Sequence, residues 1–252
     1  MEVSIFPAND VSNVFRDNYE CTLADRTSTS PVHWIFQEGM LYSNLYVHRL
    51  NGGGEDMITK NDVLLLIDIQ KGFHNPKLGS PYDLGAVENM RDLLKLWRKN
   101  KSRVIHIQHT PKERTSLFHP SKEGHDFMDG FVPENDEICI QKPTNSAFIG
   151  TDLEQVLNDN HPERVYVIGL TTPHCVSTTV RMSGNLGFST VIIEDATVSF
   201  PIGEYDGETV QKLTIATLKD EFASVKTTEQ IKESFTIENE TDGGRPHQQS
   251  TR

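Results

Sequence analysis

The strongest structural signal in the sequence lies in Arg164 to Phe188, RVYVIGLTTPHCVSTTVRMSGNLGF. It begins with an apolar, β-branched run, Val165 to Ile168, which is typical of a strand buried on both faces of a parallel sheet. Gly169 ends this strand. The threonine pair Thr171-Thr172 can cap a following helix, and Pro173 suits the first helical position, where no backbone N–H is needed. The stretch therefore predicts a strand that turns directly into a helix.

Cys175 falls in the first turn of this predicted helix. The free N–H groups and the positive end of the helix dipole at that position favour a thiolate over a thiol. The same N–H groups can hold a developing oxyanion. A cysteine at such a corner is a candidate nucleophile, although a small cysteine buried as an apolar side chain gives the same pattern.

On both sides of this stretch, predicted strands and helices alternate. Alternation of this kind indicates right-handed crossovers and a parallel sheet with helices on both faces. We therefore expect an α/β protein, a doubly wound three-layer sandwich with a mainly parallel central sheet. The predicted strands are 63–67, 104–107, 137–140, 165–168, 189–193 and 223–226, and the predicted helices are 84–99, 153–157 and 208–222.

We assign this alternation to one domain, residues 61–235, with a segment at each end. Residues 1–60 form an N-terminal extension, in which 32–36 and 41–47 are candidate short strands. Three glycines at 52–54 indicate a flexible joint before the domain. Residues 236–252 are polar and contain a glycine pair, a composition that predicts a disordered tail.

Charge and cysteine content limit the partners and the compartment. The chain has 252 residues and a net charge of −12, which argues against nucleic acid and acidic membrane surfaces as partners. The cysteines are Cys21, Cys139 and Cys175, an odd number without a disulfide framework, as expected in a reducing compartment. We see no signal peptide and no apolar run long enough for a membrane helix, so we expect a soluble, cytoplasmic protein.

The topology brings three reactive side chains to one edge of the sheet. Asp68 follows the first strand, Lys142 follows the strand at 137–140, and Cys175 follows the strand quoted above. Ligands in such sheets bind at the carboxyl ends of the strands. A carboxylate can take the proton of a thiol, and a nearby ammonium stabilises both charges. Taken singly, Asp68 is also compatible with a turn-capping carboxylate and Lys142 with a solvated cation.

Four segments together resemble a known enzyme family. They are LLIDIQKGF (65–73), KPTNSAFIGTDLEQVL (142–157), VIGLTTPHCVSTTVRMSGNLGF (167–188) and VIIEDA (191–196), and they are similar to the isochorismatase-like cysteine hydrolases. The similarity covers roughly residues 61–227. It implies a doubly wound α/β sandwich, in agreement with the strands predicted above.

The resemblance also implies roles for the three residues. Asp68 would be the general base, Lys142 the charge-stabilising partner and Cys175 the nucleophile. It further implies a cis peptide bond between Leu170 and Thr171, which would aim the N–H groups of Thr171 and Cys175 at the oxyanion. A cis bond before a residue other than proline costs about 3 kcal/mol, so it is expected only as a functional feature.

Further side chains near this edge are candidates for substrate contact. The loop 110–131 would cover the edge and is the expected selectivity element. Its basic side chains suit either a carboxylate-bearing substrate or solvent, and Phe118 and Phe127 either line the pocket or belong to the core. We predict that the substrate contacts Gln70, Phe73, His109, Phe148 and His174, and the basic residues of the loop are Lys112, Arg114, His119, Lys122 and His125.

Three functions are compatible with these residues. The first is hydrolysis of a small amide through a thioester acyl-enzyme on Cys175. The second is a true isochorismatase, which hydrolyses a vinyl ether with Asp68 as the acid and needs no thiolate. The third is a non-catalytic binding protein that retains the fold and uses the N-terminal extension as a partner surface. For the enzymes we expect a small-molecule substrate and a homo-oligomer, either a dimer or a tetramer.

The protonation state of Cys175 depends on opposing effects. The helix start and Lys142 should lower the pKa of the thiol, whereas Asp68 should raise it. If the first two effects prevail, iodoacetamide labels Cys175 before Cys21, which we expect to be exposed. Cys139 lies between two isoleucines on a strand, and we expect burial to keep it protonated.

We predict that catalysis needs no metal and no cofactor. Nicotinamidases of this superfamily bind a metal through an Asp-x-His pair and a further histidine, whereas residues 75–84 here contain no histidine. His106 and His109 alternate with isoleucines on a strand, where we assign one to the core and one to the pocket. Treatment with a chelator should leave activity unchanged. Loss of activity with EDTA and recovery with zinc would refute this prediction.

Overall fold

The computed structural model describes residues 35–37, 40–42, 58–83 and 85–242. Its main feature is a six-stranded parallel sheet. The strand order is β5-β4-β3-β6-β7-β8, and every neighbouring pair is parallel. The chain enters the sheet in the middle, at β3, and adds β4 and β5 on one side of it. It then returns to add β6, β7 and β8 on the other side. The bounds are β3 (Val63–Ile67), β4 (Arg103–His109), β5 (Ile138–Lys142), β6 (Val165–Leu170), β7 (Thr190–Val198) and β8 (Ser224–Lys226).

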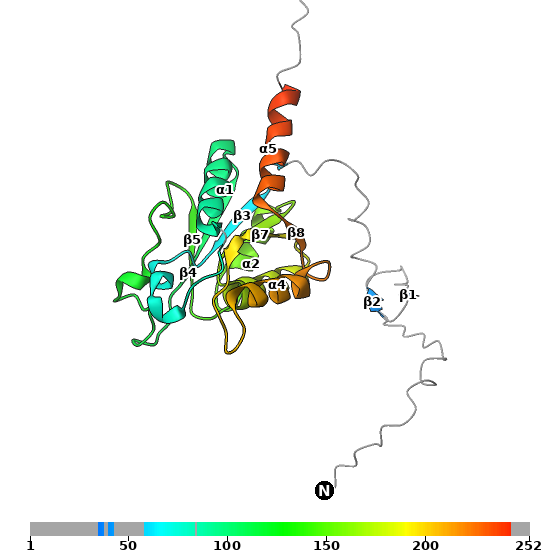
Figure 1. The fold of residues 1–252 in the computed structure, drawn as a ribbon. Helices are drawn as coiled ribbons and strands as arrows, with labels where there is room; N and C mark the ends of the chain where they lie inside the picture. The colour runs from blue at the N-terminus through cyan, green and yellow to red at the C-terminus, as the bar shows by residue number, and fades with distance from the viewer. Residues whose placement is uncertain (1–34, 38–39, 43–57, 84, 243–252) are drawn as a thin grey trace, which may run out of the picture. The chain divides into compact units, whose positions relative to one another are not determined.

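Helices cover both faces of the sheet, which confirms the predicted three-layer sandwich. Figure 1 shows α1 and α5 on one side and α2 and α4 on the other. Alternate residues of each strand point to opposite faces, so Leu64 and Leu66 pack in one core and Leu65 and Ile67 in the other. The helices are α1 (Ala86–Asn100), α2 (Leu153–Asn160), α3 (Ser177–Asn185), α4 (Gly207–Leu218) and α5 (Thr228–Asp242).

Helix α5 corrects the prediction of a disordered tail from residue 236. The helix starts after Thr227, whose side chain accepts a hydrogen bond from the N–H of Gln230 while the Gln230 side chain accepts one from the N–H of Thr227. This reciprocal cap is a sequence signal for a helix start, and the composition-based prediction overlooked it. Phe235 then packs its ring at 5.1 Å from that of Trp97 on α1. Residues 243–252 lie outside the described residues.

The N-terminal segment is described only in part. The chain divides into two units, Met1–Gly54 and Glu55–Arg252. Two strands, β1 (Ile35–Gln37) and β2 (Met40–Tyr42), pair antiparallel in the first unit. They overlap the two candidate strands of the sequence analysis, and the rest of those segments lies outside the described residues. Among the helices that are described, none has the length and apolar character required to cross a bilayer.

Gly169 allows β6 to approach β3 closely just before the reactive corner. The register between β6 and β7 shifts between Val167 and Gly169, and Gly169 has a φ of 127°. A Cβ atom at this position would collide with the carbonyl oxygen of Ile67 on β3. Only glycine satisfies both the backbone angle and the contact, which explains a glycine at the end of an otherwise apolar strand.

We expect Gly169→Ala to reduce the free energy of unfolding by about 3 kcal/mol or more, because a strained φ and overpacking against a central strand add together. Gly187→Ala is the matched control. Gly187 has a φ of 87°, but a Cβ there would meet no atom within 4 Å, so we expect a loss of only about 1 kcal/mol. Urea denaturation measures both losses. Equal losses for the two variants would show that the contact with β3 is unimportant.

Candidate active site

Asp68 lies where β3 ends, and the backbone turns its side chain into the protein. Its φ is 51°, and its N–H donates to the carbonyl oxygen of Ile107 on β4 at 2.9 Å. The side chain is fully buried. Because β3 and β6 are the central pair, Asp68 stands at the point where the strand order reverses, which is where ligands bind in doubly wound folds.

Lys142 ends the edge strand β5 and forms a buried ion pair with Asp68. The Nζ atom of Lys142 is 2.7 Å from Oδ2 of Asp68, and both side chains are at most 1% exposed. The ammonium also donates to the carbonyl oxygen of Thr144 at 3.0 Å. Two charges removed from water in this way are stable only as a pair with further hydrogen bonds, so each residue requires the other.

Cys175 lies in a π turn, Thr172–Val176, that comes before α3. This corrects the predicted helix start, because the α-helix begins only at Ser177 and no threonine side chain caps the turn. Instead, the carbonyl oxygen of Thr171 accepts hydrogen bonds from the N–H groups of His174 and Val176, at 3.1 and 3.2 Å. The peptide bond between Leu170 and Thr171, for which the resemblance implied a cis geometry, is cis.

The loop after β5 brings a further polar residue, Asn145, to the cysteine. The Cys175 Sγ atom is 3.8 Å from Oδ1 of Asn145. The N–H of Ala147 on the same loop donates to Oγ1 of Thr179 on α3 at 3.0 Å, which ties the loop to the helix behind Cys175. Sequence reasoning missed Asn145. Its position three residues after Lys142, inside the KPTNSAF segment, was the available signal.

The electrostatics around Cys175 favour the thiol over the thiolate. Burial, followed by the negative charge of Asp68, raises the pKa of Cys175 to about 12, and Lys142 only partly opposes these two effects. Burial also raises the pKa of the Asp68 carboxyl above its ordinary value, again with Lys142 acting against the rise. The expected activated thiolate is therefore wrong for the resting protein. Cys139, which we expected to be buried, is exposed, but partial burial still raises the pKa of its thiol, as we expected.

Gln70, which we predicted to contact substrate, instead connects the loop 110–131 to the sheet. Its side-chain amide donates to the carbonyl oxygens of His109 and His125, at 3.1 and 2.8 Å. Its side-chain oxygen accepts from the N–H of His109 at 2.8 Å. Gln70 is fully buried, and both amide hydrogens are used within the protein. Gln70 therefore fixes the position of the loop 110–131 against the sheet.

His109 lies directly beside Lys142, since the two residues are paired across β4 and β5. Burial and then the charge of Lys142 lower the pKa of His109 to about 4. The imidazole is therefore neutral at physiological pH. Its Nδ1 atom is buried, and within the described part of the chain it has no hydrogen-bond partner. His109 thus presents a neutral polar group next to the ion pair.

The other three predicted substrate contacts lie in different surroundings. Phe148 is buried in the core and stacks on Phe188, with ring centroids 6.2 Å apart. His174 is exposed on the π turn. Phe73 is half-buried and packs against Phe118 of the loop 110–131, with ring centroids 4.6 Å apart. Of the three, Phe73 alone combines a half-buried ring with a contact to that loop.

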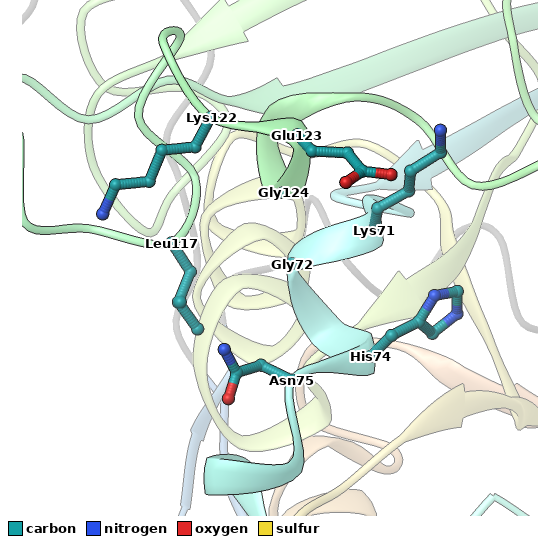
Figure 2. Close-up of a pocket in the computed structure, with 8 residues that line it drawn as sticks. All are labelled: Lys71, Gly72, His74, Asn75, Leu117, Lys122, Glu123 and Gly124. Atoms are coloured by element: carbon teal, nitrogen blue, oxygen red, sulfur yellow. The ribbon is translucent and has the colours of Figure 1, made fainter.

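A cavity of about 340 Å³ lies between this loop and the segment after Asp68, as Figure 2 shows. None of Asp68, Lys142 and Cys175 lines it. Lys122, one of the basic residues of the loop, is at its wall and donates to the carbonyl oxygen of Thr115 at 2.8 Å. The lining residues are Lys71, Gly72, His74, Asn75, Leu117, Lys122, Glu123 and Gly124.

The histidines of β4 do not form a metal site with their neighbours. In the part of the chain that the structure describes, no three His, Cys, Asp or Glu side chains gather as metal ligands would. His106 is buried, with Nε2 2.9 Å from Glu137, and Glu137 in turn binds Arg98 through both of its oxygens. His106 is therefore part of a structural ion-pair network on the side of the sheet that α1 covers.

The comparisons with known proteins identify the family. The isochorismatase domain matches residues 62–230. An isochorismatase-family protein of Bacillus subtilis, YrdC, is 46% identical over 177 residues, 68% of this chain and 95% of that protein. A solved structure of the same family from Chromobacterium violaceum is 33% identical, with a TM-score of 0.69, and covers 71% of this chain and 95% of that one.

The chain belongs to the isochorismatase family and is a hydrolase. Among its more distant relatives is the maleamate amidohydrolase of Pseudomonas putida, which is 25% identical over 152 residues, 54% of this chain and 71% of that enzyme.

The raised pKa of Cys175 predicts how its alkylation rate depends on pH. We expect the rate at which iodoacetamide labels Cys175 to rise with pH to at least about pH 10 without reaching a plateau, because the thiolate fraction is still growing there. Asp68→Asn removes a charge that raises this pKa, so the variant should label faster than the unmodified protein at the same pH.

Peptide mass spectrometry measures both rates, and exposed Cys139 is the internal control, which Asp68→Asn should not affect. A plateau near neutral pH in the unmodified protein, or slower labelling in the variant, would contradict the assigned electrostatics.

Proposed function

We propose that the protein hydrolyses a small amide through a thioester acyl-enzyme on Cys175. The observation that carries the proposal is the buried Asp68–Lys142 pair beside a protonated thiol. A thiol with a high pKa is a poor nucleophile until a base removes its proton. Asp68, whose pKa is itself raised, is a stronger base than an ordinary carboxylate.

In the first half of the reaction, Asp68 takes the thiol proton as Sγ of Cys175 attacks the amide carbonyl carbon. The N–H groups of Thr171 and Cys175 are the proposed donors to the resulting oxyanion. Lys142 stabilises the carboxylate before the transfer. When the tetrahedral intermediate collapses, Asp68 gives the proton to the leaving nitrogen, the C–N bond breaks and an amine or ammonia departs.

In the second half, water attacks the thioester carbonyl and Asp68 accepts a proton from it. Collapse of this intermediate breaks the C–S bond, and the proton returns to the sulfur as the carboxylic acid leaves. Asp68 thus acts alternately as base and acid, a role for which a raised pKa is suited. The similarity to an amidohydrolase supports this chemistry over other hydrolyses.

The raised pKa of Asp68 also favours the second candidate, hydrolysis of a vinyl ether. In that reaction a protonated Asp68 would donate a proton to the vinyl carbon, and water would add to the carbon that bears the ether oxygen and return a proton to Asp68. The C–O bond would then break to give a ketone and an alcohol, and no covalent bond to Cys175 would form. The two candidates differ in their need for the sulfur. Turnover of isochorismate by a Cys175→Ala protein would support the second, and a trapped acyl adduct on Cys175 after incubation with amides would support the first.

We predict that Cys175→Ser abolishes amide turnover without disturbing the fold. The change is nearly isosteric, but a serine hydroxyl is far harder to ionise than a thiol in the same site. Amide hydrolysis rates and circular dichroism of both proteins measure the two effects. Activity of the variant within about tenfold of the unmodified protein would reject Cys175 as the nucleophile.

A further inference from the structure

Four aromatic rings form a continuous row, which we call the aromatic row: His109, Phe118, Phe73 and Phe200. The ring centroids of His109 and Phe118 are 5.8 Å apart, those of Phe118 and Phe73 are 4.6 Å apart, and those of Phe73 and Phe200 are 6.1 Å apart. Such distances are typical of packed aromatic pairs. The row is therefore a contiguous surface.

The aromatic row crosses the edge of the sheet at which the catalytic residues lie. His109 ends β4, Phe73 follows β3 and Phe200 follows β7. β6, the strand that leads to Cys175, lies between β3 and β7 in the sheet, so Phe73 and Phe200 follow the strands on either side of it. All four residues are half-buried, whereas Asp68, Lys142 and Cys175 at the same edge are buried.

Phe118 is the member of the row that the loop 110–131 supplies, and Gly72 makes room for it. A Cβ atom on Gly72 would lie 2.5 Å from Cε1 and 2.8 Å from Cδ1 of the Phe118 ring. Figure 2 shows Gly72 facing Gly124 of the same loop, and the Cβ would also approach the Gly124 carbonyl oxygen at 3.0 Å. The glycine lets the loop bring its ring between His109 and Phe73.

We propose that Phe118, seated against Gly72, determines the size of the substrate that reaches Cys175. The inference rests on the proposed function for the nature of the substrate, which would be an amide small or flat enough to pass the aromatic row. Phe118 is a suitable barrier, because it comes from a loop rather than from the sheet and contacts rings on both sides. Its removal leaves the rings of His109 and Phe73 separated and opens the row next to His109, the residue that pairs with Lys142 across β4 and β5.

Thiol labelling tests the barrier without requiring amide turnover. Each protein is treated at one alkaline pH with iodoacetamide, a small reagent, and with N-phenylmaleimide, a bulky one, and the rates at Cys175 are read by peptide mass spectrometry. In Phe118→Ala we expect the ratio of bulky to small labelling at Cys175 to rise by about tenfold or more, the scale on which pockets discriminate size. The same ratio at exposed Cys139 should not change.

Phe127→Ala is the matched control. Phe127 belongs to the same loop, but its ring packs against His106, at 5.7 Å between centroids, and lies outside the aromatic row. In the Phe127→Ala variant we expect the ratio of bulky to small labelling at Cys175 to remain near that of the unmodified protein. The proposal would be overturned if the ratio of bulky to small labelling at Cys175 did not change in Phe118→Ala, or if it rose equally in Phe127→Ala. It would also be overturned if neither reagent labelled Cys175 in any variant. A protein that turns over no amide but shows the expected labelling would refute only the proposed function.

Gly72→Ala tests whether Gly72 determines the position of the Phe118 ring. The added methyl group displaces Phe118, so the ratio at Cys175 should differ from that of the unmodified protein. In the Phe118→Ala background the same change should have little further effect, because residues in contact give non-additive effects. Thermal unfolding shows that each variant is folded. Additive effects of the two substitutions would show that Gly72 acts independently of Phe118 and would overturn this part of the proposal.

Discussion

The ion pair between Asp68 and Lys142 is the interaction on which the site depends. Each side chain lies in surroundings that would exclude a lone charge, and removal of one partner from such a pair typically costs about 3–5 kcal/mol. The pair also joins two strands that are not neighbours, since β4 lies between β3 and β5. It therefore fixes the active edge of the sheet across three strands and gives the cysteine a defined electrostatic environment.

That environment follows from the topology of the chain. Asp68 and Cys175 follow the two strands at the centre of the sheet, where successive connections leave in opposite directions. Gly169 lets these strands approach closely, and the π turn then presents the sulfur beside the carboxylate. The loop after β4 is tied across this edge by Gln70. The architecture thus buries the charges and leaves a row of half-buried rings at the same edge of the sheet.

Much of the fold could be predicted from the sequence because its signals are local. The continuous apolar runs of β3 and β6 identify buried parallel strands, and the spacing of Met90, Leu93 and Trp97 identifies α1. Helix α5 was missed because its cap depends on two side chains, Thr227 and Gln230, whereas the prediction relied on composition. The order of the motifs also selected Asp68, Lys142 and Cys175, and the structure pairs the first two of them.

The remaining features of the site depend on distances between segments that are remote in sequence. The role of Gln70 arises from backbone atoms of His109 and His125, which no local pattern reveals. The protonation of Cys175 depends on burial and on the charge of Asp68 outweighing that of Lys142. A helix-start argument considers only the nearest backbone and therefore gave the wrong sign for the shift of this pKa.

The protonated resting cysteine has a consequence for the durability of the enzyme. Peroxides attack thiolates rather than thiols, and the resulting sulfenic acid proceeds to irreversible oxidation states if nothing reduces it. A thiol with a pKa of about 12 is almost entirely in the unreactive form at neutral pH. In the proposed mechanism, Cys175 becomes reactive only while Asp68 holds its proton during an encounter with substrate. The same burial that should slow alkylation therefore protects the sulfur of Cys175 from oxidants.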